Sequence, residues 1–139
     1  MIVVLDTNVL VQALNGGHPF ARILDRWTLG RFSWALSTDV LMEYEEVITR
    51  MLGSMIWQQV TRMMDLADSV HGNLIRVATY FQFLTITGDR DDDKFADCSI
   101  AAHADYIITE DRHFRSLVDA GYKPQPISPQ EFIARHLTP

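Results

Sequence analysis

The chain has 139 residues, which is the usual length of one globular domain. Hydrophobic residues make up 47% of it and charged residues 22%, so the composition excludes a disordered, collagen-like or coiled-coil protein. The net charge of −6 disfavours a generic nucleic-acid-binding domain, which is usually basic, but it leaves room for an enzyme that approaches nucleic acid through bound cations.

Cysteine content and hydropathy indicate where the protein works. Cys98 is the single cysteine, which excludes an internal disulfide and fits a reducing compartment. No apolar run approaches the roughly 18 residues that cross a bilayer. The N-terminal MIVVLDTN lacks a basic segment before its apolar run, so it predicts a strand rather than a signal peptide. We expect a cytoplasmic protein that does not enter membranes and folds as a single domain over residues 1–139.

The first half of the chain alternates short apolar runs with helical patterns. A β-branched run predicts a buried strand over Ile2–Leu5, and a second strand is predicted over Phe32–Leu36. Helical spacing of apolar residues predicts three helices, over residues 9–14, 20–27 and 40–51. From Ser54 to Tyr80 the pattern stays helical, with Gly72-Asn73 as the expected break.

The second half repeats this alternation. A third strand is predicted over Phe83–Ile86, followed by an acidic turn over residues 88–92 and a helix of small residues over 95–104. A fourth strand is predicted over Tyr106–Ile108. Prolines 124 and 126 interrupt the chain, and Pro129 suits the first turn of a last helix that ends near His136. The alternation predicts an α/β fold with a central, mainly parallel sheet.

Acidic residues follow each predicted strand in chain order. Asp6 directly follows the first strand, and Glu43 lies one turn into the helix after the second. Asp93 directly follows the acidic turn, at the head of the next helix, and Asp111 follows the fourth strand. Ligands of parallel sheets bind beyond the carboxyl ends of the strands, where these acids would meet. The repetition is the main functional signal of the sequence.

Each acid also has a purely structural interpretation. An Asp between a strand and a helix can serve only as a helix cap, and for Asp6 the two interpretations are equally weighted. Glu43 lies at the border of the apolar stripe of its predicted helix, whereas Glu45 and Glu46 point farther toward solvent. Glu43 is therefore the glutamate expected to lean into a cleft.

Asp93 and Asp97 are four residues apart and share one helix face. Like charges at this spacing are destabilising by roughly 0.2–0.5 kcal/mol unless a cation compensates them. Carboxylates without cysteine or histidine pairs favour a hard cation, Mg²⁺ or Mn²⁺, over zinc.

Three stretches resemble one known family. VVLDTNVLVQAL (3–14), LSTDVLMEYEEVITRM (36–51) and DDDKFADCSIAAHADYIITEDRHF (91–114) are similar to the acidic motifs of a PIN domain, in the order and at the intervals of that family. The chain resembles in particular the prokaryotic PIN proteins that act as toxins of toxin–antitoxin pairs, the VapC-like ribonucleases. The resemblance implies a three-layer α/β/α sandwich with a sheet of four to five strands.

The resemblance also implies an active site. Asp6, Glu43, Asp93 and Asp111 match the family's acidic quartet, which holds one or two Mg²⁺ or Mn²⁺ ions for hydrolysis of RNA phosphodiester bonds. Asp97 is an expected additional ligand. Further residues are expected to orient the quartet (Thr7, Asn8, Thr109) or to contact substrate phosphates (Arg90, Arg112, Arg115). The expected partners are RNA, a small antitoxin protein and a second copy of the chain in a homodimer.

Three other classes of protein share part of this pattern. A PIN fold can act as a non-catalytic RNA- or protein-binding module, which chelation of metal would leave unaffected. A phosphatase of the haloacid dehalogenase type needs a second Asp two residues after Asp6, where this chain has Asn8. A phosphoreceiver domain needs an Asp at the end of its third strand and a Lys at the end of its fifth, and neither is evident.

Overall fold

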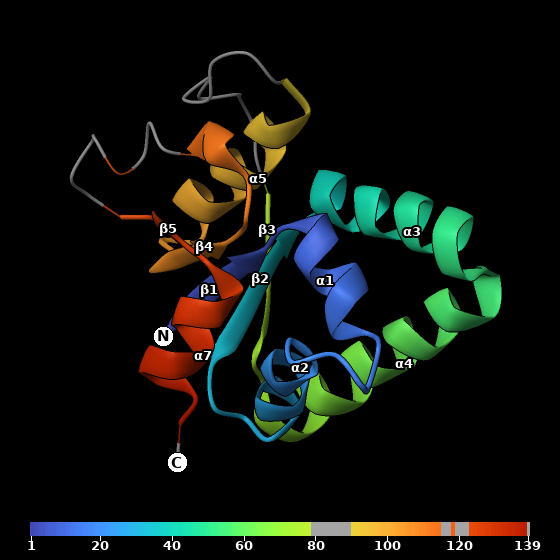
Figure 1. Ribbon diagram of the computed structural model, residues 1–139. Helices are drawn as coiled ribbons and strands as arrows, with labels where there is room; N and C mark the ends of the chain where they lie inside the picture. Colours follow the sequence, from blue (N-terminus) through green and yellow to red (C-terminus); the bar gives the residue numbers. More distant parts are fainter. Residues whose placement is uncertain (79–89, 115–117, 119–122, 139) are drawn as a thin grey trace.

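The computed structural model describes residues 1–78, 90–114, 118 and 123–138, and for residues 90–93 it describes the backbone alone. Strands and helices alternate along the chain (Figure 1). The elements are β1 (Ile2–Leu5), α1 (Thr7–Ala13), α2 (Ala21–Thr28), β2 (Ser33–Ser37), α3 (Thr38–Leu52), α4 (Ser54–His71), β3 (Leu74–Val77), α5 (Arg90–Ala101), β4 (Tyr106–Ile108), η1 (Arg112–Phe114), β5 (Gln125–Ile127) and α7 (Pro129–His136).

The five strands form one sheet in the order β3-β2-β1-β4-β5, and every pair is parallel. The chain runs outward from β1 to β3 and then returns to the other side of β1, where β4 pairs with it in the register Leu5 opposite Ile108. Right-handed crossovers place the outward and returning connections on opposite faces of such a sheet. The order of the strands therefore reverses between β1 and β4.

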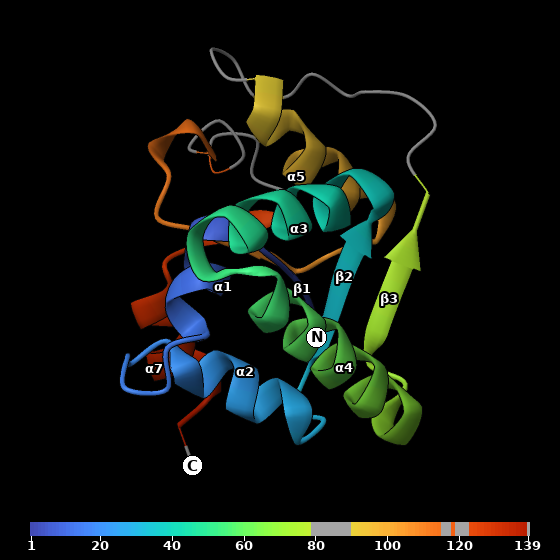
Figure 2. The ribbon, with the colours of Figure 1, turned by 90° about the vertical axis from the view of Figure 1, so that its right-hand side faces the viewer.

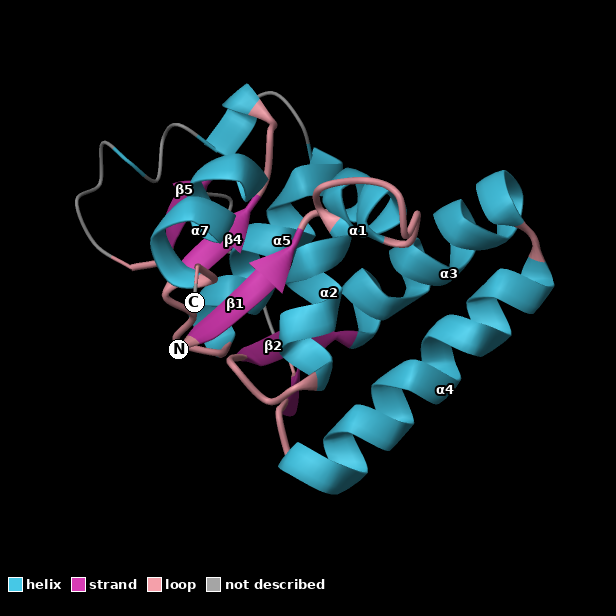
Figure 3. Cartoon of the chain, turned by 60° about the horizontal axis from the view of Figure 1, so that its bottom comes forward, coloured by secondary structure: helices cyan, strands magenta, loops and turns pink. Residues whose placement is uncertain are grey.

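Helices cover both faces of the sheet (Figures 1 and 2). Helices α1 to α4 lie on one face, and α5 lies on the other against β1, β2 and β4. Figure 3 shows α3 and α4 as two long neighbouring helices, while α7 packs against α2. The predicted α/β/α sandwich with a parallel sheet is confirmed. No helix among the described residues combines the length and apolar character that crossing a bilayer requires.

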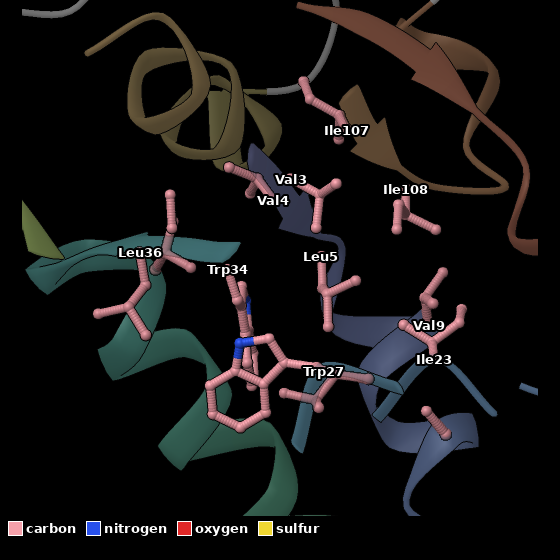
Figure 4. Close-up of a cluster of buried hydrophobic side chains, with 14 of the residues drawn as sticks. Val3, Val4, Leu5, Val9, Ile23, Trp27, Trp34, Leu36, Ile107 and Ile108 are labelled. Atoms are coloured by element: carbon pink, nitrogen blue, oxygen red, sulfur yellow. The ribbon is translucent and has the colours of Figure 1, made fainter. Parts of the chain in front are cut away.

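The core forms where the central strands meet these helices (Figure 4). Val3 and Val4 of β1 are fully buried, as expected for a strand covered on both faces. Trp27 of α2 packs edge-on against Trp34 of β2, with ring centroids 5.1 Å apart. The Trp27 indole also donates a hydrogen bond to the Asn73 carbonyl, which ties the end of α2 to the start of β3.

The third strand differs from the prediction. The helical pattern assigned to residues 54–80 ends at Gly72, which has a φ of 63°, and β3 begins two residues later at Leu74. Gly72 adopts this left-handed conformation easily, so it terminates α4. Leu74, Ile75 and Val77 then pair with β2. The predicted strand over residues 83–86 lies outside the described residues.

Two further elements were misplaced. Helix α5 begins at Arg90, so the backbone of residues 90–92 is helical rather than part of the predicted turn. A strand, β5, passes through Pro126, because this edge strand pairs only with β4 and can tolerate a residue without an N–H. The last helix, α7, is confirmed: Pro129 occupies its first turn and the Ser128 hydroxyl caps it by accepting from the Glu131 N–H.

Candidate functional site

Asp6 lies at the carboxyl end of β1, beside the end of β4. Its backbone N–H donates to the Ile108 carbonyl at 3.0 Å, so the β1–β4 pairing fixes its position. Although Asp6 precedes α1, its side chain makes no capping hydrogen bond to that helix. Oδ2 instead accepts a hydrogen bond from the Thr109 hydroxyl at 2.6 Å. The interpretation of Asp6 as only a helix cap is therefore wrong.

The Asp6 carboxylate is in an unfavourable environment for its charge. The residue is 7% exposed. Burial raises the pKa of Asp6, the Thr109 hydroxyl and the Thr7 backbone N–H partly oppose this rise, and the negative charges of Asp111 and Glu43 add to it. Glu43 of α3 and Asp111 after β4 therefore both act on the carboxylate at the end of β1.

Asp111 is connected to Asp6 through Thr109. The Thr109 hydroxyl donates to Asp6 and accepts from the Asp111 backbone N–H at 2.9 Å. Asp111 Oδ1 in turn accepts from the His113 backbone N–H and pairs with the His113 ring nitrogen Nδ1, each at 2.9 Å. Thr109 thus connects two of the predicted acids, and its expected function of orienting them stays a prediction.

Helix α3 brings Glu43 to the same edge of the sheet. The preceding strand, β2, ends at Ser37, whose hydroxyl caps α3 by accepting from the Val40 N–H at 3.2 Å. Tyr44 is fully buried, and its hydroxyl donates to the Leu5 carbonyl, immediately before Asp6. This hydrogen bond anchors the turn of α3 that carries Glu43 to the end of β1.

The Glu43 carboxylate has two hydrogen-bond donors. The Thr7 hydroxyl donates to Oε2, and the Lys94 ammonium of α5 donates to Oε1 at 3.0 Å. The Glu43 side chain is 19% exposed. Glu45 and Glu46 are exposed, so the predicted difference between the three glutamates is found in the geometry of α3.

The other predicted site residues have varied environments. Asp97 is 3% exposed on α5. Burial raises the pKa of the neighbouring Cys98 thiol to about 12, and the charge of Asp97 adds a smaller rise. Asn8 is exposed on α1, and Arg112 is exposed on η1. The side chains of Asp93 and Arg90, and all of Arg115, lie outside the described residues. The functions expected for these residues stay predictions.

The carboxylates of this site are candidate ligands for a divalent cation. The described residues contain no group of three or more His, Cys, Asp or Glu side chains already arranged to hold a metal ion. The oxygens of Asp6, Glu43 and Asp111 are nevertheless the hard ligands that Mg²⁺ and Mn²⁺ prefer. The negative charges of Glu43 and Asp111 repel that of Asp6, and a bound cation would offset this repulsion. The chemistry of these residues fits such an ion.

Sequence reasoning missed Lys94 as part of this site. It occurs inside the DDDKF motif, directly after Asp93, and is the one basic residue of the acidic segment 91–97. That contrast of charge was the available signal, although it did not indicate Glu43 as the partner. His113 is exposed, and it binds Asp111.

Comparisons with known proteins identify the family and the fold of the chain. The family model of the PIN domain matches residues 2–113, and the chain therefore belongs to the PIN domain family. No curated protein matches it. Its fold is similar to a chain in the crystal structure of VapBC2 from Rickettsia felis bound to a DNA fragment from their promoter, with a TM-score of 0.53 and 19% identity over 83% of this chain and 92% of that one.

Proposed function

We propose that this protein is a divalent-metal-dependent endoribonuclease that hydrolyses RNA phosphodiester bonds. Membership of the PIN domain family supports a nuclease, because members of the family are generally metal-dependent nucleases. The observation that carries the proposal is the buried Asp6 carboxylate. It lies between the ends of β1 and β4, where the strand order reverses, and two further carboxylates act on it.

The acids have distinct functions in this proposal. Asp6 and Asp93 would bind the cation directly, while Glu43 and Asp111 would bind it directly or through water, and Asp97 is a further candidate ligand. A bound Mg²⁺ or Mn²⁺ supplies an activated water and stabilises charge on the phosphate. One or two ions are compatible with this number of acids.

The surrounding residues orient these carboxylates. Thr109 holds Asp6 Oδ2 and the Asp111 backbone, so both acids keep a fixed relative position. Thr7 holds Glu43 Oε2. A phosphodiester that approaches this edge of the sheet would meet Arg112 on η1, which can offset the charge of the substrate.

Cleavage of RNA by the purified protein tests this proposal. Incubation with a panel of single-stranded and structured RNAs is expected to give products in Mn²⁺ or Mg²⁺ and none in EDTA, with activity restored by adding excess metal. Asp6→Asn measured in parallel distinguishes this site from a contaminating nuclease. Equal cleavage with and without EDTA would exclude the metal mechanism. Metal-independent RNA binding without cleavage would favour the non-catalytic binding module.

We extend the proposal to partners and cellular context. The similarity of the fold to a chain of VapBC2, a pair bound to DNA of its own promoter, supports a toxin with a small antitoxin partner in the cytoplasm. A homodimer is proposed as well. Co-expression with the product of a small neighbouring gene, followed by size-exclusion chromatography, is expected to yield a complex larger than the isolated protein.

A further inference from the structure

Lys94 makes an ion pair inside the group of acids. Its Nζ atom lies 3.0 Å from Glu43 Oε1, and the two side chains are 25% and 19% exposed. Lys94 comes from α5 and Glu43 from α3, so the pair connects helices on opposite faces of the sheet. Lys94 directly follows Asp93 in the chain.

This pair differs from the other ion pairs of the described residues. In Arg135–Glu131 the side chains are 54% and 56% exposed, and in Arg76–Asp65 they are 57% and 75% exposed. Such exposed pairs contribute little because solvent screens them. Lys94 and Glu43 are shielded from most of the solvent, so solvent screens this pair less than it screens the exposed pairs.

The charges around Glu43 give Lys94 a further effect. A divalent cation is attracted by the carboxylates and repelled by an ammonium that already occupies one of the Glu43 oxygens. Without a cation, the same ammonium offsets the negative charge of Glu43 through their ion pair. Lys94 therefore favours the metal-free arrangement and disfavours the metal-bound one.

We propose that Lys94 is a positioning residue of the candidate site, whose ammonium holds Glu43 among the carboxylates in the absence of a divalent cation and competes with that cation for Glu43 Oε1. The inference rests on the proposed function, because it requires that Glu43 take part in binding the metal. It assigns Lys94 a control over metal affinity in addition to any contribution to the fold.

The test compares Lys94→Met with Lys94→Arg and wild type. Methionine keeps much of the side-chain length without charge, and arginine keeps the charge. Lys123→Met is the matched control, because Lys123 pairs with Asp105 at the amino end of β4, away from the acids. Mn²⁺ affinity is measured by titration calorimetry on metal-free protein, and thermal melts in EDTA report stability.

Lys94→Met is expected to bind Mn²⁺ about fivefold more tightly than wild type, because the ammonium that competes for Glu43 Oε1 is removed, and to melt at a lower temperature in EDTA. Lys94→Arg and Lys123→Met are expected to keep the wild-type affinity. The same substitution is also made in a Glu43→Gln variant, where Lys94 has lost its charged partner. There, Lys94→Met is expected to change the logarithm of the Mn²⁺ affinity by less than half as much as it does in wild type. Unchanged or weaker Mn²⁺ binding by Lys94→Met would overturn the inference, because a merely structural lysine would lower the melting temperature alone.

The two proposals fail in distinguishable ways. If wild type binds Mn²⁺ and cleaves RNA while Lys94→Met has the same affinity, the proposed function stands and the inference about Lys94 is wrong. If wild type neither binds Mn²⁺ nor cleaves RNA, the proposed function is wrong, and the competition inferred for Lys94 is overturned with it.

Discussion

Asp6 carries a negative charge in a place that disfavours it. Burial is the largest cause of its raised pKa, and the charges of Asp111 and Glu43 act in the same direction. A group whose pKa is higher in the folded state stabilises the fold when it is protonated. This contribution is present below the ordinary value of 3.8 and is lost as the pH rises through the higher pKa of the folded state. At neutral pH the Asp6 carboxyl therefore lowers the stability of the metal-free protein.

Asp6→Asn tests this conclusion at the scale of one side chain. The amide oxygen can still accept from Thr109, while the charge is removed, so we expect the melting temperature in EDTA to rise by about 2–4 °C at neutral pH. The gain should shrink as the pH falls toward 3.8, where the wild-type carboxyl becomes neutral as well. RNA cleavage should be lost. A variant that is less stable than wild type and still cleaves RNA would contradict both the electrostatic and the functional interpretation.

Helix α3 presents its glutamates in different directions. Tyr44 packs into the core, Glu43 beside it reaches Thr7 and Lys94, and Glu45 and Glu46 face solvent. A functional difference between chemically identical side chains should therefore follow from their place on one helix.

Glu43→Gln is expected to lower RNA cleavage by about tenfold or more, since a neutral amide is a poorer ligand for a hard cation than a carboxylate. Glu45→Gln is the matched control, because it changes the same group on the same helix and should leave the rate unchanged. Initial cleavage rates at a fixed Mn²⁺ concentration measure the comparison. Equal rates for the two variants would show that Glu43 has no special function in cleavage.

The turn after α2 provides a stability test away from the acids. Gly30 has a φ of 79°, and a Cβ atom placed there would lie 2.8 Å from the His71 ring at the end of α4. We expect Gly30→Ala to lower the free energy of unfolding by about 1–2 kcal/mol, from the left-handed conformation alone. Urea unfolding measures the change. Gly16→Ala is the control, because Gly16 has open space around it and no positive φ; a similar loss there would refute the explanation.

The elements that sequence reasoning placed well are those with strong local signals. Residues 2–5 form a run of apolar, mostly β-branched side chains, and Pro129 begins the last helix, so β1 and α7 were found. The strand β3 was missed because Leu74–Val77 is short and directly follows a long helical pattern. Its pairing with β2 is a tertiary effect that the local sequence does not express. The strand β5 was missed because Pro126 is normally evidence against a strand.

At the scale of the molecule, the order of the acids could be predicted but their contacts could not. Parallel strands bring their carboxyl ends to one edge, so Asp6, Glu43 and Asp111 were expected near one another. The hydrogen bond from Thr109 to Asp6 follows from the pairing of β1 with β4. The contact of Lys94 with Glu43 depends on how α5 and α3 pack against each other beyond the carboxyl ends of the strands. No periodicity in the sequence encodes this packing.

The pairing of β1 with β4 also determines when the site can exist during synthesis. The ribosome makes Asp6 early, and Thr109, its hydrogen-bond donor, 103 residues later. A nascent chain that lacks β4 has a central strand with one edge open, and its Asp6 has neither Thr109 nor Asp111 beside it. If the protein cleaves RNA as proposed, it is therefore inactive during most of its own translation, and the messenger that encodes it is protected from the unfinished enzyme.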